Sequence, residues 1–145
     1  MASFVYTPAL GLLAAATLTG DVRAILVMSN TTADTETDSE FIGSITTLDQ
    51  YDGAGYARVA LTTEAWAAVL ATDRFKFSAD AIVFPSLSVG TRQCVGLLLY
   101  LHVTNDADSK ALMYIDGTGF PFDGNGANVT FTPHADGIMY TRNAP

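Results

Sequence analysis

The pattern of apolar and polar residues changes character near residue 21. Before that point, Thr7 and Pro8 form a favourable start for a helix, and the residues from Ala9 to Ala16 are mostly strong helix formers, with Gly20 placed to end the run. After it, short segments rich in Val, Ile, Thr, Tyr and Phe alternate with Asp, Asn, Gly and Pro. The pattern therefore predicts one N-terminal helix followed by a β-rich remainder.

Nine segments of this remainder have the length and composition of strands. The segment 91–103 is almost wholly apolar, as expected of a central strand that is covered on both faces. The predicted strands cover residues 23–28, 41–45, 55–61, 74–77, 81–84, 91–103, 112–115, 129–132 and 137–141. Residues 62–71 are ambiguous, and their pattern is compatible with a helical turn or two or with a loop.

Many short strands with a single helix favour an antiparallel β-sandwich of jelly-roll type over a fold of alternating strands and helices. At 145 residues the chain has the usual length of one domain. We predict a mainly β, single-domain antiparallel sandwich over residues 1–145 with one short N-terminal helix. Residues 1–20 form an N-terminal arm and the helix, and residues 21–145 carry the strands.

The composition is acidic and unusually poor in charge. Fifteen acidic residues against seven basic ones give a net charge of −8, and 15% of residues are charged while 49% are hydrophobic. The negative charge disfavours nucleic acid and anionic membranes as partners. The shortage of charge suggests that part of the surface is covered by other subunits, and we expect a homodimer or a homotrimer.

Cysteine usage and the N-terminal sequence predict folding in the cytoplasm. The single cysteine, Cys94, cannot form an internal disulfide and lies in an apolar run, where we expect a buried and unreactive thiol. Residues 10–16 are apolar, but no Lys or Arg precedes them, so we predict no signal peptide. The longest apolar run is about half of the ~20 residues that a membrane-spanning helix needs.

Four carboxylates alternate through one polar segment: Asp34, Glu36, Asp38 and Glu40. Oxygen-rich loops of this kind can bind divalent cations. A calcium loop usually carries a glycine to turn the chain, and this segment has none before Gly43. We expect a solvated acidic loop, and a divalent-ion site remains the alternative.

Other residue types that could support catalysis or metal binding do not form a recognisable motif. Residues 123–126 begin like an EF-hand loop, but Ala127 and His134 occupy positions that need ligands, so we expect a tight turn there. His102 and His134 are far apart in sequence, and we interpret both as structural. We predict no enzyme activity, no metal and no cofactor.

Two pairs of aromatic residues are candidates for contact with a partner. Phe120 and Phe122 flank a proline in a glycine-rich stretch, where their rings either pack into the core or press on another protein. Phe4 and Tyr6 precede the helix in a terminus that frays unless it is docked, and the same two alternatives apply.

Several segments in a fixed order resemble a family of small virion structural proteins of tailed bacteriophages, which includes capsid decoration or cement proteins. The segments are residues 20–29, 33–38 with Phe41, 52–58, 91–93 followed by 96–100, 114–116 and 135–138. The resemblance implies a jelly-roll protein that binds the major capsid protein on the outer surface of the phage head. It implies stabilisation of the shell against internal pressure, and it implies no catalytic residues.

Two other functions compete with decoration of the capsid. A tail or neck component that forms a ring would belong to the same virion. A carbohydrate-binding β-sandwich is the more remote alternative, for which Trp66, Tyr100 and Tyr114 could serve as stacking platforms.

Overall fold

A computed structural model describes residues 3–14, 20–72 and 74–142 of the chain. The protein is mainly β with antiparallel strands and one short α-helix near its N-terminus, as the sequence predicts. The elements are β1 (Phe4–Val5), α1 (Thr7–Ala14), β2 (Asp21–Met28), η1 (Ile42–Ser44), β3 (Val59–Ala60), β4 (Ala65–Val69), η2 (Leu70–Thr72), β5 (Arg74–Ser78), β6 (Ile82–Phe84), β7 (Cys94–His102), β8 (Lys110–Ile115), β9 (Val129–Phe131) and β10 (Met139–Arg142).

The largest sheet has the strand order β1-β8-β7-β2-β3, and every neighbouring pair is antiparallel. Its centre is the pairing of β2 with β7, which runs from Asp21 opposite His102 to Met28 opposite Cys94. Both strands are buried along most of their length, because each carries a nearly continuous run of aliphatic residues that suits a strand covered on both faces.

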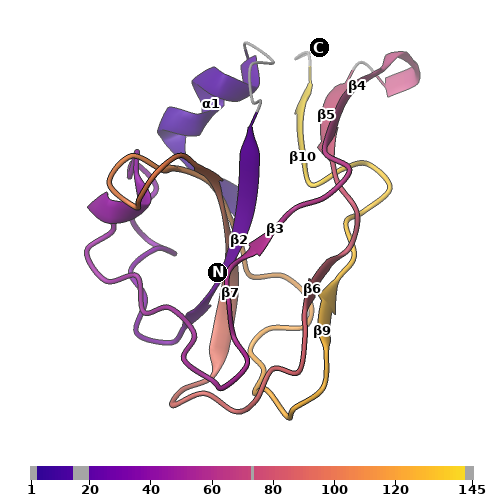
Figure 1. The fold of residues 1–145 in the computed structure, drawn as a ribbon. Coiled ribbons are helices and arrows are strands. Elements are labelled where there is room, and N and C mark those ends of the chain that lie inside the picture. Colours follow the sequence, from indigo (N-terminus) through magenta and orange to yellow (C-terminus); the bar gives the residue numbers. More distant parts are fainter. Residues whose placement is uncertain (1–2, 15–19, 73, 143–145) are drawn as a thin grey trace.

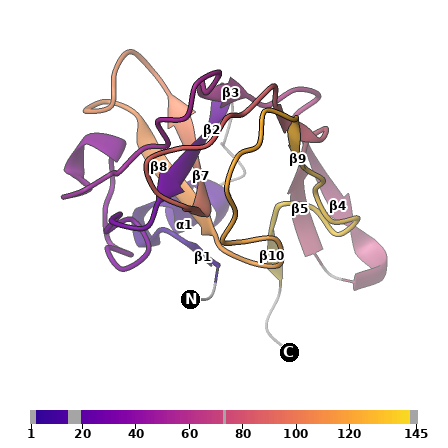
Figure 2. The same ribbon diagram turned by 90° about the horizontal axis from the view of Figure 1, so that it is seen from below.

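Two smaller sheets form a second layer. One has the order β10-β5-β4, and the other pairs β6 with β9. Figures 1 and 2 show the loops of residues 29–58 on one side of the large sheet and both small sheets on the other. Helix α1 packs beside β8 and β10. A single hydrophobic core joins the layers, with Phe77, Phe84 and Met139 from the small sheets among its members.

The segment 62–71, for which the sequence allows a helical turn or a loop, is mostly a strand, with an irregular start at 62–64 and a 3₁₀ turn from Leu70. Ala65–Val69 is strand β4, which pairs with β5 from Ala65 opposite Ser78 to Val69 opposite Arg74. The ring of Trp66 stacks on Phe75 with centroids 5.5 Å apart and lies 5.1 Å from Phe77. These cross-strand aromatic contacts favour the extended conformation over the helical preference of the alanines.

Two other predicted strands are corrected. The hydroxyl of Ser44 donates to the carbonyl of Phe41 at 2.7 Å and accepts from its amide at 3.2 Å, which closes a 3₁₀ turn where a strand was expected. In the segment 55–61, Gly55 has a φ of +85° and lies in a turn, so pairing begins only at Val59. The predicted helix end, at Ala16, lies outside the described residues.

One buried tyrosine holds three loops together. The hydroxyl of Tyr51 donates to the carbonyl of Ser88 at 2.9 Å and accepts from the amides of Gly90 at 2.9 Å and Gly124 at 3.1 Å. Tyr51 is 2% exposed, so these backbone groups have little access to water as an alternative partner. A single oxygen therefore connects the loops before β3, before β7 and before β9.

Candidate functional site

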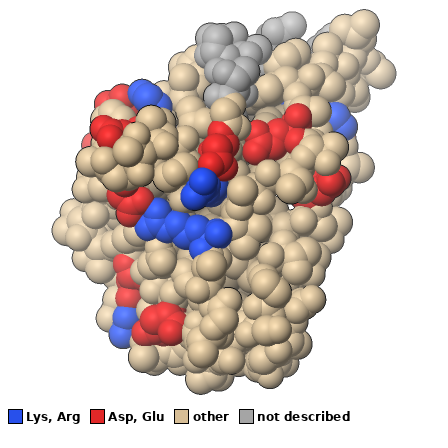
Figure 3. All heavy atoms as spheres, viewed as in Figure 1, with Lys and Arg blue, Asp and Glu red and all other residues tan. Residues whose placement is uncertain are grey.

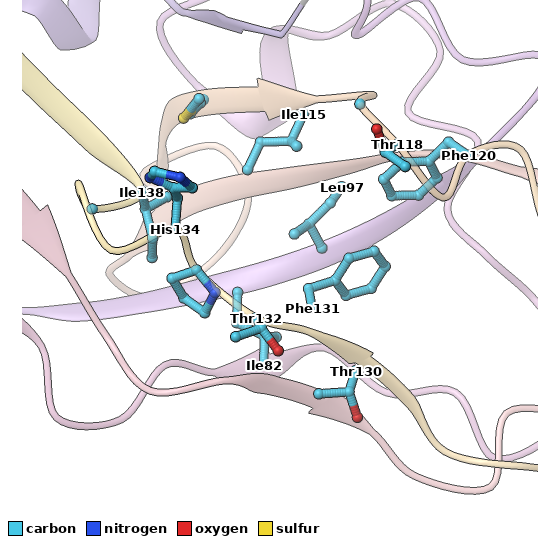
Figure 4. A pocket seen from close by; sticks show the side chains of 14 residues that line it. Ile82, Leu97, Ile115, Thr118, Phe120, Thr130, Phe131, Thr132, His134 and Ile138 are labelled. Atoms are coloured by element: carbon cyan, nitrogen blue, oxygen red, sulfur yellow. The ribbon is translucent and has the colours of Figure 1, made fainter.

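The best candidate for a binding site is a pocket of about 370 Å³ between the two layers, which we call the interlayer pocket. Strands β7 and β8 supply Leu97 and Ile115 from the large sheet, and β6 and β9 supply Ile82 and Phe131 from the opposite side. Figure 4 shows these side chains converging on the space between the ribbons. The pocket exists because the facing apolar side chains leave part of the gap between the layers unfilled.

The lining of the interlayer pocket is apolar with a few polar groups. Phe120 and Phe131 stack with centroids 5.4 Å apart, and Phe122 lies 5.6 Å from Phe120. The polar lining side chains are Thr118, Thr130, Thr132 and His134. None of the lining residues in the described structure is a carboxylate or a cysteine. The pocket is suited to holding an apolar group.

The structure separates the four aromatic candidates. Phe120 and Phe122 are partly buried and pack against the core, with Phe120 in the wall of the interlayer pocket. Phe4 is also partly buried and stacks on Tyr114 at 5.6 Å. Tyr6 is 0% exposed, and its hydroxyl donates to the carbonyl of Ala33 at 2.7 Å. Of the two alternatives for Tyr6, the structure shows the packing into the core, where the fully buried ring has no surface to offer a partner.

The carboxylates of the segment 34–40 face different partners. One oxygen of Glu36 accepts from the amide of Thr46 at 3.0 Å, and Glu40 pairs with Lys110 at 2.8 Å. Within residues 3–14, 20–72 and 74–142, no three His, Cys, Asp or Glu side chains come together as a metal site. The segment is held by local hydrogen bonds, which differs from the convergence of oxygens that a divalent cation requires.

Cys94 and the two histidines take different positions. Cys94 is fully buried, and burial raises the pKa of its thiol to about 12, which keeps it protonated and unreactive. His102 lies edge-on to Tyr100 with centroids 6.1 Å apart. His134 is exposed, and its Nδ1 accepts from the amide of Asp136 at 3.1 Å. The two histidines are not brought together.

The turn at 123–126 is confirmed. The side-chain oxygen of Asn125 accepts from the amide of Ala127 at 3.0 Å, and Gly126 has a φ of +85°. This arrangement is an Asx turn followed by a residue in the left-handed region, where glycine is favoured.

Two of the three proposed sugar platforms are inaccessible. Tyr100 and Tyr114 are each 1% exposed, so neither presents a ring face to solvent. Trp66 is half-buried in the second layer, where it stacks on Phe75. The three rings therefore do not form a common aromatic surface.

The basic side chains are already engaged within the protein. Of the six Lys and Arg residues whose side chains are described, five contact a carboxylate, and Lys76 donates to the carbonyl of Ala135 at 2.8 Å. The five ion pairs are Arg23–Asp21, Arg58–Asp106, Arg74–Asp136, Arg92–Asp49 and Lys110–Glu40. In Figure 3 the blue groups lie beside red ones, and the surface over β6 and β9 is free of charge.

The most connected of these pairs joins Arg58 to Asp106. The guanidinium binds both carboxylate oxygens at 2.5 and 2.9 Å, and its Nε donates to Gln50 at 2.7 Å. The hydrogen bond from Arg58 holds the pKa of Asp106 below its ordinary value of 3.8. The bridge connects the loop before β3 to the loop between β7 and β8.

The Arg58–Asp106 pair predicts a specific loss of stability in acid. Because the pKa of Asp106 is lower in the folded state, its stabilisation is complete above 3.8 and disappears as pH falls through the folded pKa. Asp106 is 40% exposed, so we expect a contribution of about 1 kcal/mol or less at neutral pH. Arg58→Met should flatten the dependence of the urea midpoint on pH between neutrality and values below 3.8.

The control for this experiment is Arg23→Met, which removes the pair of Arg23 with Asp21 on β2. The pKa of Asp21 is also lowered, mainly by its hydrogen bond to Arg23, but Arg23 binds only one of the two carboxylate oxygens, whereas Arg58 binds both oxygens of Asp106. Its loss should change the pH dependence less. Identical pH profiles for wild type and Arg58→Met would contradict the assignment.

Several large apolar side chains are exposed in the monomer. They are Leu10 (51%), Leu70 (85%), Val83 (36%), Val89 (64%), Val103 (58%) and Tyr140 (50%).

Among the described residues, no helix has the length and apolar character needed to cross a membrane. Neither a family model, nor a curated protein, nor a solved structure matches the chain.

Proposed function

We propose that this chain is a structural protein of a bacteriophage virion, a decoration or cement protein that binds the major capsid protein on the outside of the head. In this role it acts as a homo-oligomer that stabilises the shell against internal pressure. The jelly-roll topology belongs to the same proposal. The ordered resemblance of its segments to small virion proteins motivates the proposal, and the surface of the monomer supports it.

The observation that carries the proposal is an acidic, charge-poor surface on which the described basic groups are already engaged. A protein that grips nucleic acid needs unpaired Lys and Arg along a groove or face. Here the described cations contact carboxylates or a backbone carbonyl, while side chains such as Leu70 and Val89 are exposed. Such a surface favours contact with other proteins.

The net charge supports the proposed position outside the shell. The net charge of −8 repels packaged DNA, which disfavours a place on the inner surface of the head. The interlayer pocket is an apolar cavity that can receive a side chain of a partner. No carboxylate or cysteine lines this pocket, and the proposed role needs none.

In the proposed mechanism, each bound copy adds contacts that stabilise the shell. Each copy bridges neighbouring subunits of the shell, so that the pressure of the genome must break the added contacts as well as the original ones. Many copies on one particle multiply a modest energy per site. No chemical step is required of any residue.

The test is the location of the protein in purified parent virions. We expect mass spectrometry to detect the chain and a reconstruction to place multiple copies on the outer surface of the head. Particles that lack it should release their DNA at lower temperature. Absence from purified particles, or density confined to the tail or neck, would refute the proposal.

A further inference from the structure

Strand β4 is an edge strand that lacks the usual features that prevent pairing with another chain. It is the last strand in the order β10-β5-β4, so one side pairs with β5 while no described strand pairs with the other. Its sequence, Ala-Trp-Ala-Ala-Val, contains no charge and no proline, and Ala65, Ala67 and Ala68 are exposed. Natural edge strands usually carry a device that prevents pairing with another chain, such as a charge, a proline or a bulge.

The other sheet edges of the described structure are blunted by their length or their sequence. The large sheet ends in β1 and β3, each only two residues long. The β6–β9 ribbon has strands of three residues, and the four-residue β10 ends at Arg142. Strand β4 has five residues and remains neutral into η2, whose Leu70 is 85% exposed. The contrast within one molecule marks β4 as the edge that is left open.

The charge around β4 allows two acidic copies to approach there. The chain carries a net charge of −8, so most orientations of two copies are repulsive. On β5, the neighbouring strand, Arg74 and Lys76 lie directly opposite Val69 and Ala67. Directly opposite residues share one face of a sheet, so this face of the β4 edge carries basic groups. Arg74 is paired with Asp136, but Lys76 donates to the carbonyl of Ala135, so its positive charge beside β4 lowers the repulsion between two copies at this edge.

We propose that β4 pairs with β4 of a second copy of this chain, antiparallel and about a two-fold axis at Ala67. The sheet β10-β5-β4 then continues across the dimer as six strands. This register places Trp66 opposite Ala68 of the second copy and Ala65 opposite its Val69. A large residue faces a small one at each of these positions, which is the complementarity that cross-strand packing favours.

The inference rests on the proposed function only for the expectation that the chain self-associates. It adds that β4 is the surface through which two copies bind. Backbone hydrogen bonds between the two edges supply the affinity, as in other cases of strand addition. The isologous contact uses the same patch on both copies, so it closes at a dimer and leaves the other faces available to a shell.

The test is the substitution Ala67→Glu, studied in the full chain. In the monomer the new carboxylate would lie opposite Lys76, a favourable pair, so the fold should be retained. In the dimer two glutamates would face each other, and we expect the dissociation constant to rise about tenfold or more. The measurement is sedimentation velocity over a wide range of concentration, with circular dichroism as the check of folding.

A matched control and a rescue make the result specific. Val103→Glu adds the same charge at a residue that is 58% exposed and directly follows β7 of the large sheet, outside the sheet β10-β5-β4, and it should associate like wild type. Ala67→Lys should also weaken self-association, whereas a mixture of Ala67→Glu and Ala67→Lys should form a heterodimer with restored affinity. Rescue in the mixture would show direct contact between the two positions.

The three outcomes are distinct. A wild type of twice the 15.3 kDa mass of one chain, weakened by Ala67→Glu and restored in the mixture, supports the β4 contact. An oligomer that Ala67→Glu leaves intact overturns the β4 contact but keeps self-association as part of the proposed function. A wild type that stays monomeric overturns the pairing of two copies, and binding of that monomer to heads then tests the capsid function separately.

Discussion

Leu26→Ala is expected to lower the free energy of unfolding by about 3 to 5 kcal/mol. Leu26 is 0% exposed on the central strand β2, where it lies opposite Leu97 of β7. Its truncation removes apolar contacts and leaves a cavity that the paired backbones of β2 and β7 prevent from collapsing. Urea unfolding followed by fluorescence measures the change.

The matched control is Leu70→Ala, the same substitution at a side chain that is 85% exposed. Its expected effect is below about 0.5 kcal/mol, because little of the Leu70 side chain leaves water when the protein folds. Equal urea midpoints for the two variants would show that Leu26 does not lie in the core.

Tyr51→Phe has the second-largest expected effect, a loss of about 2 to 4 kcal/mol from the removal of one oxygen atom. The carbonyl of Ser88 and the amides of Gly90 and Gly124 would lose their partner together. A buried polar group without a partner costs more than the average hydrogen bond contributes, and here three such groups are affected. Thermal and urea unfolding would measure the loss.

A local measurement separates this explanation from a general loss of packing. Amide hydrogen exchange at Gly90 and Gly124 should accelerate more than exchange at the central strand residue Leu98. The control is Tyr140→Phe, at a tyrosine that is 50% exposed, which should change stability little. Uniform acceleration across the sheet in Tyr51→Phe would contradict the role of the hydroxyl as a connector of loops.

The sequence predicted the central strands well because their signal is local. The apolar runs that became β2 and β7 are long, and few other structures can bury them on both faces. The short helix was also predicted, because Thr7, Pro8 and the following alanines and leucines favour a helix. The antiparallel, mainly β character of the fold follows from the spacing of these elements.

The features that the sequence missed depend on residues far away in the chain. The sequence pattern left Tyr6 in a terminal arm, but its hydroxyl finds the carbonyl of Ala33, and the adjacent strand β1 pairs with β8. Strand β4 has alanines that favour a helix, and its conformation is decided by Phe75 and Phe77 on β5. No local pattern encodes such partners.

The candidate site also depends on contacts between residues far apart in the chain, which the sequence could not predict. The sequence identified Phe120 and Phe122 but left open whether they enter the core, and it offered no reason to join them to Phe131. The interlayer pocket is formed by side chains from several strands that are separated along the chain. Periodicity could show that these residues are apolar, but not that a space remains between them.

The pairing of β2 with β7 also determines the order in which the protein can be built. Strand β2 ends at Met28, whereas its partner β7 begins only at Cys94. Strand β1, near the N-terminus, pairs with β8, which lies still later in the chain. During synthesis β1 and the edge of β2 that faces β7 must therefore remain unpaired until most of the chain has left the ribosome. Strand β2 can pair earlier with the short β3, and the hairpin of β4 and β5 can also close early. In every nascent copy the open edge of β4 is thus available before the central sheet exists.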